Sequence, residues 1–241
     1  MTAPMMPPPG AFFDHYDPLI APRYPELGAG PLPTGPYISP EYFEKEREKI
    51  FAKAWFKVGH ESEVPNPGSY FVHDLPVLKT SIIIVRGQDG VVRGFHNVCT
   101  HRGNELEARD ACGNKRLFVC SYHSWSFDGT GTLKGVPERD RFVDLDTETR
   151  GLKPVSVTVW NGIIWLNPQE QPEQTLEQYL GPIAERLKDY PFPRMRMAAA
   201  WRVDIKANWK IVVDAFQEGY HVATVHRNVA PEMYRAARTG H

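Results

Sequence analysis

Two cysteine and histidine pairs in the middle of the chain are the residues best suited to metal chemistry. Cys99 and His101 lie two positions apart, and Cys120 and His123 lie three apart, in the stretch CTHRGNELEARDACGNKRLFVCSYHSW. Thiolate and imidazole both bind iron and zinc, so the donor types alone leave the metal open. The order of the donors says more, because a common zinc finger takes two sulfurs from one loop and two histidines from a helix.

Each of these two loops instead offers one sulfur and one imidazole. A [2Fe-2S] cluster with unlike irons, one bound by two Cys and the other by two His, needs this alternation if each loop is to reach both irons. Nearby glycines, such as Gly103 and Gly113, permit tight loops with backbone N–H groups turned towards the cluster sulfides. The pattern favours such a cluster over a zinc site. Cys112 has no partner at ligand spacing and is interpreted as a bystander.

A second group of candidate ligands lies in NWKIVVDAFQEGYHVATVHR, which contains His221 and His226. On an ideal helix, two side chains five residues apart point about 140° away from each other. One unbroken helix would therefore point the two rings apart. Either the helix ends or bulges between them, or they do not share a metal. Asp214, Glu218 and His221 share a helix face, and a Glu one turn before a ligand His can orient its ring.

The elements that must position these groups begin with a proline-rich arm. Residues 1–40 contain eleven of the 22 prolines and lack hydrophobic period, which indicates an extended segment. Ser39 as N-cap and Pro40 at the first helical position then predict the start of an amphipathic helix with a charged outer side. Its apolar residues fall near one face: Phe43, Ile50, Phe51, Ala54 and Trp55.

From about Phe56 to Pro168 the sequence changes to short β-branched and aromatic runs separated by turn residues. This pattern predicts a small, mostly antiparallel β domain with both Cys/His pairs in connections between strands. Asn161-Gly162, between VSVTVW and IIWL, predicts a two-residue hairpin turn. Beyond it we expect a helix through TLEQYLGPIAERLKDY, a strand in RMAAAWRVDIKA and a helical start at Asn208.

Composition narrows the classes of partner. The 241 residues carry 28 Lys+Arg and 29 Asp+Glu, a formal net charge of −1, so no broad positive field favours nucleic acid or an anionic membrane. No window reaches the ~18 apolar residues of a membrane helix, and no targeting segment is found at the N-terminus. Three cysteines without a secretory context favour a reducing, cytoplasmic setting over a disulfide framework.

The cysteine-containing region resembles the Rieske iron–sulfur domain of the Rieske non-haem iron oxygenases, over roughly residues 57–168. The positions that match the family pattern are Cys99, His101, Arg102, Gly103, Gly113, Asn114, Cys120, Tyr122, His123, Trp125, Gly131, Leu133 and Pro137. Two positions depart from it, with Ser121 where the family usually has Pro and Ser124 where it usually has Gly. We expect the first to alter loop stiffness and the second to alter the hydrogen bonds near the cluster.

The later segment is similar to the mononuclear-iron motif of the same family, which opens with Asn-Trp-Lys, here residues 208–210. The resemblance implies that His221 and His226 are two ligands of a 2-His-1-carboxylate Fe(II) site. It also implies that Glu218 bridges this site to a Rieske histidine, His123, across a subunit boundary. Many ring-hydroxylating members have Asp at this position, so a Glu at position 218 slightly favours other branches of the family.

The resemblance implies an α+β fold in three parts. Residues 1–56 form the arm and amphipathic helix, 57–168 the small antiparallel-β Rieske [2Fe-2S] domain, and 169–241 the beginning of a helix-grip-like α+β catalytic domain. The carboxylate ligand comes from further along the chain in the family, and neither Asp214 nor Glu232 is a convincing substitute. We therefore expect the N-terminal portion of a longer α subunit, inactive alone.

The implied function is an oxygenase component in which electrons from NAD(P)H reach the cluster through a reductase or ferredoxin. Fe(II) and O₂ then hydroxylate a small organic substrate, most often aromatic in this family, by dihydroxylation or monooxygenation. A homotrimer, with or without a β subunit, is expected. Three alternatives are an electron-transfer protein without an oxygenase site, a monooxygenase or demethylase acting on a quaternary amine, and a zinc-binding interaction module.

Overall fold

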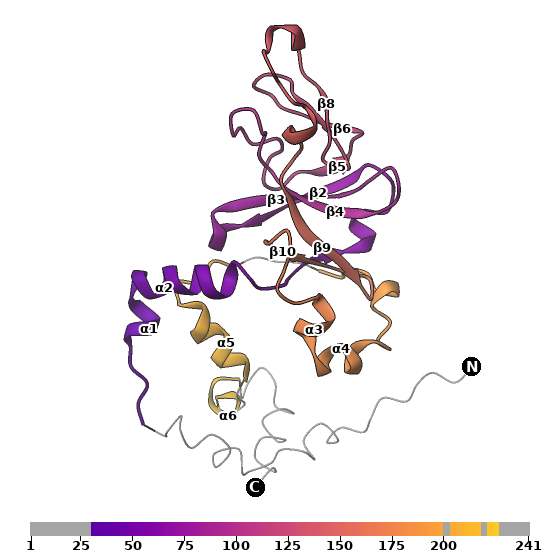
Figure 1. The fold of residues 1–241 in the computed structure, drawn as a ribbon. Coiled ribbons are helices and arrows are strands. Elements are labelled where there is room, and N and C mark those ends of the chain that lie inside the picture. The colour runs from indigo at the N-terminus through magenta and orange to yellow at the C-terminus, as the bar shows by residue number, and fades with distance from the viewer. Residues whose placement is uncertain (1–29, 200–202, 218–220, 227–241) are drawn as a thin grey trace, which may run out of the picture.

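The computed structural model describes residues 30–199, 203–217 and 221–226, and an antiparallel β domain forms its centre (Figure 1). Seven strands form one sheet in the order β1-β10-β9-β4-β3-β2-β5. These strands are β1 (Phe56–His60), β2 (Ser69–Leu75), β3 (Thr80–Arg86), β4 (Val92–His96), β5 (Cys112–Asn114), β9 (Pro154–Trp160) and β10 (Ile163–Asn167). Every pair of neighbours is antiparallel, which confirms the predicted β domain.

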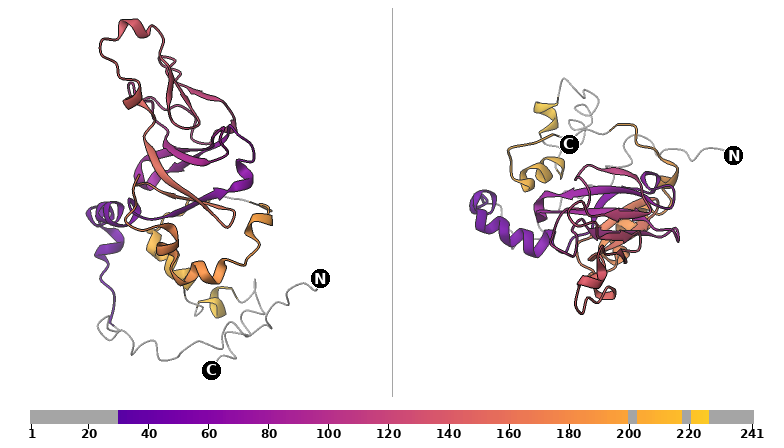
Figure 2. Two further views of the ribbon diagram at one scale, coloured as in Figure 1. Left: turned by 45° about the vertical axis from the view of Figure 1, so that its right-hand side comes forward. Right: turned by 90° about the horizontal axis from the view of Figure 1, so that it is seen from above.

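A smaller sheet and a set of helices lie at opposite ends of this domain, as Figures 1 and 2 show. The small sheet has the order β6-β7-β8. Its strands are β6 (Leu117–Val119), β7 (Ser126–Asp128) and β8 (Leu133–Gly135). The helices at the other end are α3 (Leu176–Leu180), α4 (Pro182–Leu187), α5 (Trp209–Gln217) and α6 (Val222–Val225).

Strand β3 explains how one sheet supports two cores. Its apolar run is buried on both faces, and successive side chains of a strand point to opposite sides. Ile83 and Val85 pack into a core with the cysteine loops and aromatic residues of the small sheet. Ile82 and Ile84 pack into a second core, built with residues of β2, β9 and β10. The first of these cores positions the candidate metal ligands.

The predicted hairpin is confirmed between β9 and β10, where Trp160 pairs with Ile163. Asn161 and Gly162 both have positive φ, 48° and 79°, as a two-residue turn of this kind requires. The Asn161 amide donates hydrogen bonds to the carbonyl oxygens of Leu187 and Tyr190, both at 3.0 Å. The turn is therefore held against the segment that follows α4.

We expect Gly162→Ala to destabilise the protein more than Gly90→Ala, a matched control. Both glycines have φ near 80°, so an alanine at either position carries a strain of about 1–2 kcal/mol. Only at Gly162 would the new Cβ meet backbone, 2.7 Å from the Pro193 Cα, which adds about 1–3 kcal/mol of overpacking. Urea unfolding measures the difference, and equal losses for the two variants would contradict it.

The N-terminal helical segment begins as predicted and then changes character. After the short α1 (Gly35–Ile38), the Ser39 hydroxyl accepts a hydrogen bond from the Tyr42 N–H at 3.1 Å and caps α2 (Pro40–Glu46). From Arg47 to Phe51 the helix winds as a π-helix. The changed winding turns residues out of the α-helical register, and Ile50 is 46 % exposed. The predicted apolar face is therefore wrong at this position.

Two further expectations about helices and strands are corrected. The helix predicted from Thr175 onwards starts with a capping box between Thr175 and Gln178 but breaks at Gly181, which has φ 52° and ψ −133° and precedes Pro182. A strand was predicted over residues 196–207. The described residues of this segment, 196–199 and 203–207, form no strand, and residues 200–202 lie outside the described residues. No described strand pairs with this segment, and β propensity alone does not form a strand.

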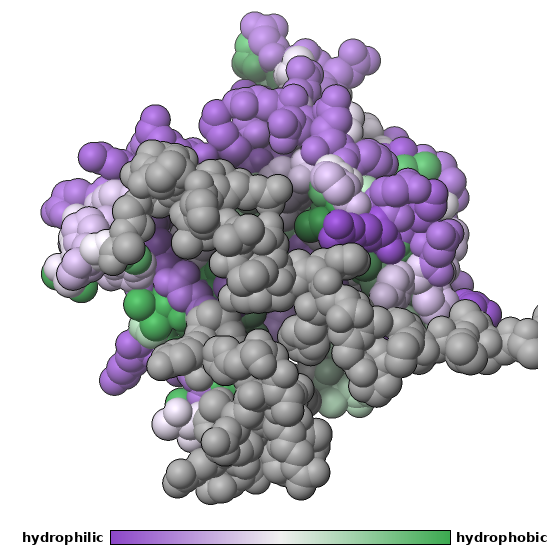
Figure 3. All heavy atoms as spheres, turned by 90° about the horizontal axis from the view of Figure 1, so that it is seen from below, coloured by the Kyte–Doolittle hydropathy of each residue, from purple (hydrophilic) through white to green (hydrophobic). Residues whose placement is uncertain are grey.

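The described helices are too short or too polar for any of them to cross a membrane. On the face shown in Figure 3, hydrophilic residues cover most of the coloured surface and hydrophobic residues form separate patches. Two large apolar side chains of α5 contribute to the exposed apolar surface, Phe216 at 87 % and Ile211 at 51 %. The described part of residues 169–241 thus leaves apolar side chains uncovered.

Candidate metal centre

The two cysteine loops have the same backbone hydrogen-bond pattern. The Cys99 N–H donates to the carbonyl oxygen of Asn104, five residues later, and the Cys99 carbonyl oxygen accepts from Gly103, four residues later. The Cys120 N–H likewise donates to Trp125, and its carbonyl oxygen accepts from Ser124. The sequence places the two loops between strands, and the folded chain makes them equivalent.

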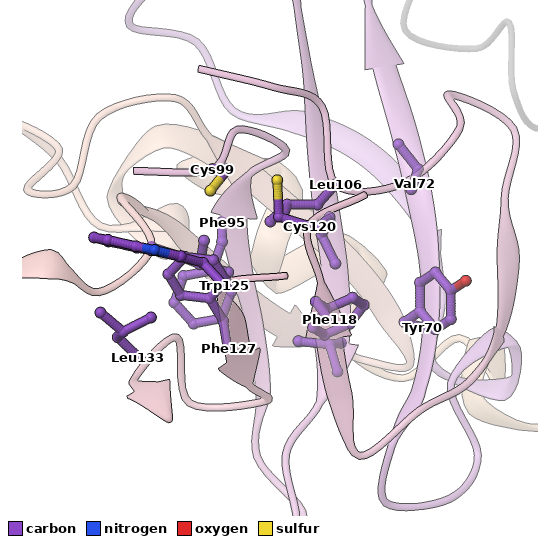
Figure 4. Close-up of a cluster of buried hydrophobic side chains, with 13 residues drawn as sticks. Tyr70, Val72, Phe95, Cys99, Leu106, Phe118, Cys120, Trp125, Phe127 and Leu133 are labelled. Carbon is purple, nitrogen blue, oxygen red and sulfur yellow. The ribbon is translucent and has the colours of Figure 1, made fainter. Parts of the chain in front are cut away.

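Both cysteine side chains belong to the aromatic core beneath the loops. Each is 2 % exposed, neither forms a disulfide, and Figure 4 shows the two sulfur atoms on the same side of this core. Burial raises the pKa of the Cys99 thiol. Burial also opposes ionisation of Cys120, but hydrogen bonds from the Tyr122 and His123 N–H groups and from the Cys99 and Asn104 side chains together outweigh it and hold the pKa of Cys120 below its ordinary value. Two thiols within reach of each other are suited to binding one metal as thiolates.

The histidine rings of the two loops also meet. The ring centroids of His101 and His123 are 4.6 Å apart, and His101 stacks on the buried Trp125 at 4.7 Å with an interplanar angle of 8°. The buried Nδ1 atom of His101 has no hydrogen-bond partner among the described residues. Burial and the nearby charges of His123, Arg102 and Arg150 lower the pKa of His101, which keeps its ring neutral and able to bind a metal.

These donors suit a two-iron cluster better than a single ion. A zinc ion needs four donors within about 2.0–2.3 Å of one point. Within the described ranges, no three His, Cys, Asp or Glu side chains converge closely enough to hold a single metal ion. A [2Fe-2S] cluster needs two sulfurs at one iron and two imidazoles at the other. Paired cysteines, paired histidines and an unpartnered imidazole nitrogen fit that requirement.

The second histidine pair is also brought together. Helix α5 ends at Gln217, His221 precedes α6 and His226 follows it. Helix α6 ends at Val225, between the two histidines, and their ring centroids lie 5.2 Å apart. The third residue predicted for this region, Glu218, lies outside the described residues.

Two family models match the chain, one over the cysteine loops and one over the later histidine pair. Residues 54–158 match the Rieske [2Fe-2S] domain, and residues 192–240 match the ring hydroxylating alpha subunit (catalytic domain). The chain thus joins a Rieske domain to part of the catalytic domain of a ring-hydroxylating α subunit. The oxygenase subunit of carnitine monooxygenase from Acinetobacter baumannii is 35 % identical over 196 residues, which cover 80 % of this chain and 52 % of that protein.

Solved structures of Rieske oxygenases agree with this assignment. The quaternary ammonium Rieske monooxygenase CntA in complex with L-carnitine has a TM-score of 0.76 and 34 % identity, covering 83 % of this chain and 56 % of that one. Naphthalene 1,2-dioxygenase from Rhodococcus sp. has a TM-score of 0.71 and 33 % identity, covering 80 % and 45 %. The chain thus spans about half the length of these Rieske oxygenase relatives.

One departure from the Rieske oxygenase pattern links the two loops. The Ser121 hydroxyl, at the position where the family usually has Pro, accepts a hydrogen bond from the Asn104 side-chain amide at 3.2 Å. The same amide donates to the Glu105 carbonyl oxygen at 2.7 Å. A proline could not accept this bond. The expected change in loop stiffness thus has a specific form, since the serine replaces a rigid ring by a cross-loop hydrogen bond.

The second departure places a strained residue in the cluster loop. Ser124 has φ 57°, and the equivalent residue of the other loop is Gly103, with φ 77°. We expect Ser124→Gly to raise the free energy of unfolding by about 1 kcal/mol, because an L-residue in this region costs roughly 1–2 kcal/mol. Ser124→Ala keeps the strained backbone and is expected to bring no gain. Urea unfolding compares them, and a loss of stability in Ser124→Gly would contradict the interpretation.

The structure gives two residues contacts that the sequence did not indicate. Trp125 was recognised as a motif position, but its stacking on His101 depends on the turn that folds the loop back. Glu46 lies in the charged run of the N-terminal helix, yet it is 5 % exposed. It is buried because it pairs with a lysine 164 positions later, which no local pattern reveals.

Proposed function

We propose that this chain is the electron-accepting part of a Rieske oxygenase that hydroxylates a small organic molecule. The observation that carries the proposal is the meeting of two equivalent loops, each with one thiol and one imidazole. Cys99 and Cys120 are the ligands proposed for one iron, and His101 and His123 for the other. When bound, the [2Fe-2S] cluster supplies one-electron transfer. The proposed Rieske domain spans residues 57–168, between the arm and helix (1–56) and the start of the catalytic domain (169–241).

His221 and His226 are the proposed ligands of a mononuclear Fe(II). Their rings are 5.2 Å apart, which is compatible with one ion about 2.1 Å from a nitrogen of each ring. Two histidines and one carboxylate leave coordination positions open at such an ion, which is the arrangement typical of non-haem Fe(II) oxygenases. Neither histidine is proposed as an acid or base, since each ring has to remain neutral to bind the metal.

The proposed reaction is a monooxygenation of a quaternary amine. One atom of O₂ enters a C–H bond of the substrate, and the other leaves as water after two electrons and two protons are supplied. The carnitine monooxygenase and CntA relatives support this alternative over the expectation of an aromatic substrate. Naphthalene 1,2-dioxygenase is about as similar to this chain in sequence as CntA is. An aromatic compound is therefore the competing proposal for the substrate.

The proposed partners are those of the family. Electrons come from NAD(P)H through a reductase, with or without a ferredoxin, and Glu218 is proposed to bridge His123 of one chain to the Fe(II) site of the next in a homotrimer. One study of CntA concerns inter-subunit electron transfer, which supports this arrangement. A β subunit and a cytoplasmic setting remain predictions from the sequence.

Metal and sulfide analysis tests the two centres. We expect two irons and two sulfides bound per chain through the Rieske loops, a reduced-state EPR signal, and further Fe(II) binding that is lost in His221→Ala. Two irons without the further Fe(II) would favour an electron-transfer protein. A colourless preparation with zinc and no sulfide would overturn the Rieske assignment.

Product analysis tests the substrate class. A longer α subunit that includes the carboxylate ligand expected beyond this chain is supplied with a reductase, NADH and O₂, and L-carnitine or naphthalene is offered in separate reactions. Hydroxylated or demethylated amine products, dependent on reductase, are the expected result. A naphthalene diol with no amine product would replace the quaternary amine by an aromatic substrate.

A further inference from the structure

A buried ion pair joins the N-terminal helix to the start of α5. The Glu46 carboxylate is paired through one oxygen with Lys210 Nζ at 2.5 Å. Its other oxygen accepts a hydrogen bond from the Trp209 indole N–H at 3.0 Å. Burial raises the pKa of Glu46, but these two donors outweigh it, so its pKa lies below its usual range. The carboxylate is therefore charged, buried and bonded through both oxygens.

Aromatic rings enclose the lysine at this junction. Lys210 Nζ lies 5.4 Å from the ring centroid of Tyr37, 5.6 Å from Tyr42 and 5.2 Å from Trp209, all within the range of cation–π attraction. The Phe51 ring contacts Trp209 edge-on at 5.3 Å. The Asn208 side chain adds a hydrogen bond to the Tyr37 carbonyl oxygen at 3.1 Å. Apart from the contact between Lys210 and Trp209, these contacts join residues 37–51 to residues 208–210.

The same N-terminal segment is attached to the Rieske domain. It leads directly into β1, and the Lys53 carbonyl oxygen accepts a hydrogen bond from the Asn167 amide at the end of β10. Just beyond this domain, the Gln174 carbonyl oxygen accepts a hydrogen bond from the Trp55 indole N–H at 3.2 Å. Beyond its first turn α5 is mostly exposed, with Phe216 at 87 %. In the part of the chain that the structure describes, the junction at Glu46 is thus the main polar attachment of α5.

We propose that Glu46 and Lys210 are positioning residues that fix α5, and with it the His221–His226 pair, against the segment entering the Rieske domain. This inference rests on the proposed Fe(II) site, because it concerns the geometry of that site's histidines. Removing one member of a buried ion pair leaves an uncompensated charge in the protein, which costs more than the loss of an exposed pair. The start of α5 should then detach while the distant cysteine loops are unaffected.

The test compares Glu46→Gln with Glu44→Gln in the cluster-loaded chain. Glu44 is the matched control, since it lies on the same helix and pairs with Arg47 but has a 52 % exposed side chain. In Glu46→Gln we expect backbone hydrogen exchange in residues 209–217 to accelerate about tenfold or more, and anaerobic Fe(II) affinity to fall roughly 10- to 100-fold. The cluster absorbance and the exchange of β3 should not change in either variant.

A double substitution separates the ion pair from general destabilisation. Lys210→Met alone should behave like Glu46→Gln, whereas Glu46→Gln with Lys210→Met removes both charges and should recover part of the protection of α5. Equal exchange in Glu46→Gln and Glu44→Gln would overturn the inference, and so would faster exchange with unchanged Fe(II) affinity. If the unsubstituted chain shows no Fe(II) binding that depends on His221, the proposed iron site fails and the positioning role fails with it. Normal Fe(II) binding in both the unsubstituted chain and Glu46→Gln contradicts the inference alone.

Discussion

Cys120→Ser is expected to abolish the visible absorbance and the reduced-state EPR signal of the cluster, whereas Cys112→Ser should retain both. Cys120 is buried, with its sulfur beside that of Cys99, and a serine hydroxyl is a much poorer ligand for iron than a thiolate. Cys112 is exposed on the edge strand β5 and lies in no such pair.

Iron and sulfide content gives the measurement a second, independent readout. In Cys120→Ser sulfide should fall to near zero and iron should fall by two per chain, whereas Cys112→Ser should keep the iron and sulfide content of the unsubstituted chain. The His101→Ala and His123→Ala variants should also lose the spectrum. An intact spectrum in any of these three ligand variants would contradict the cluster assignment, and loss of the cluster in Cys112→Ser would show that the two-pair interpretation omits a necessary cysteine.

Trp125→Ala is the substitution expected to affect stability most. The side chain is 2 % exposed, lies in the core beneath the cysteine loops and stacks on His101. Replacing a buried tryptophan by alanine removes its transfer free energy and leaves a cavity, for a loss of about 3–5 kcal/mol in the free energy of unfolding.

Urea unfolding followed by far-ultraviolet circular dichroism measures this loss. Trp125→Phe is the matched variant, because a phenylalanine ring keeps part of the packing and the stacking on His101 and should lose less. Val143→Ala, at a side chain 89 % exposed, should change stability by less than about 0.5 kcal/mol. A loss in Trp125→Ala no larger than that of Val143→Ala would contradict the role assigned to this core.

Local sequence signals predicted the parts of the fold that local chemistry determines. Ser39 caps the helix that it was expected to cap, and Asn161-Gly162 forms the expected turn, because both depend on residues close in the chain. The alternation of Cys and His predicted which side chains would meet. Helical geometry left two alternatives for His221 and His226, and α6 ends at Val225, between them.

Features that depend on distant contacts could not be predicted in this way. Glu46 lies in the charged run EKEREK and has the pattern of a solvent-facing residue, but its environment is made by Trp209 and Lys210. The π-helical winding after it likewise follows no local signal that we recognise. The break at Gly181-Pro182 had a signal, since proline disfavours the helical conformation of the residue before it, but the apolar periodicity on both sides concealed it.

The burial of β3 on both faces has a consequence for how this protein can change. Ile83 faces the core of the cysteine loops and its neighbour Ile82 faces the other core. Substitutions one residue apart therefore act on different halves of the molecule, and effects on separate cores tend to add. A smaller side chain at position 83 would loosen the packing beneath the two cysteine loops and leave the core around Ile82 intact. Engineering and natural selection can therefore change the two cores separately.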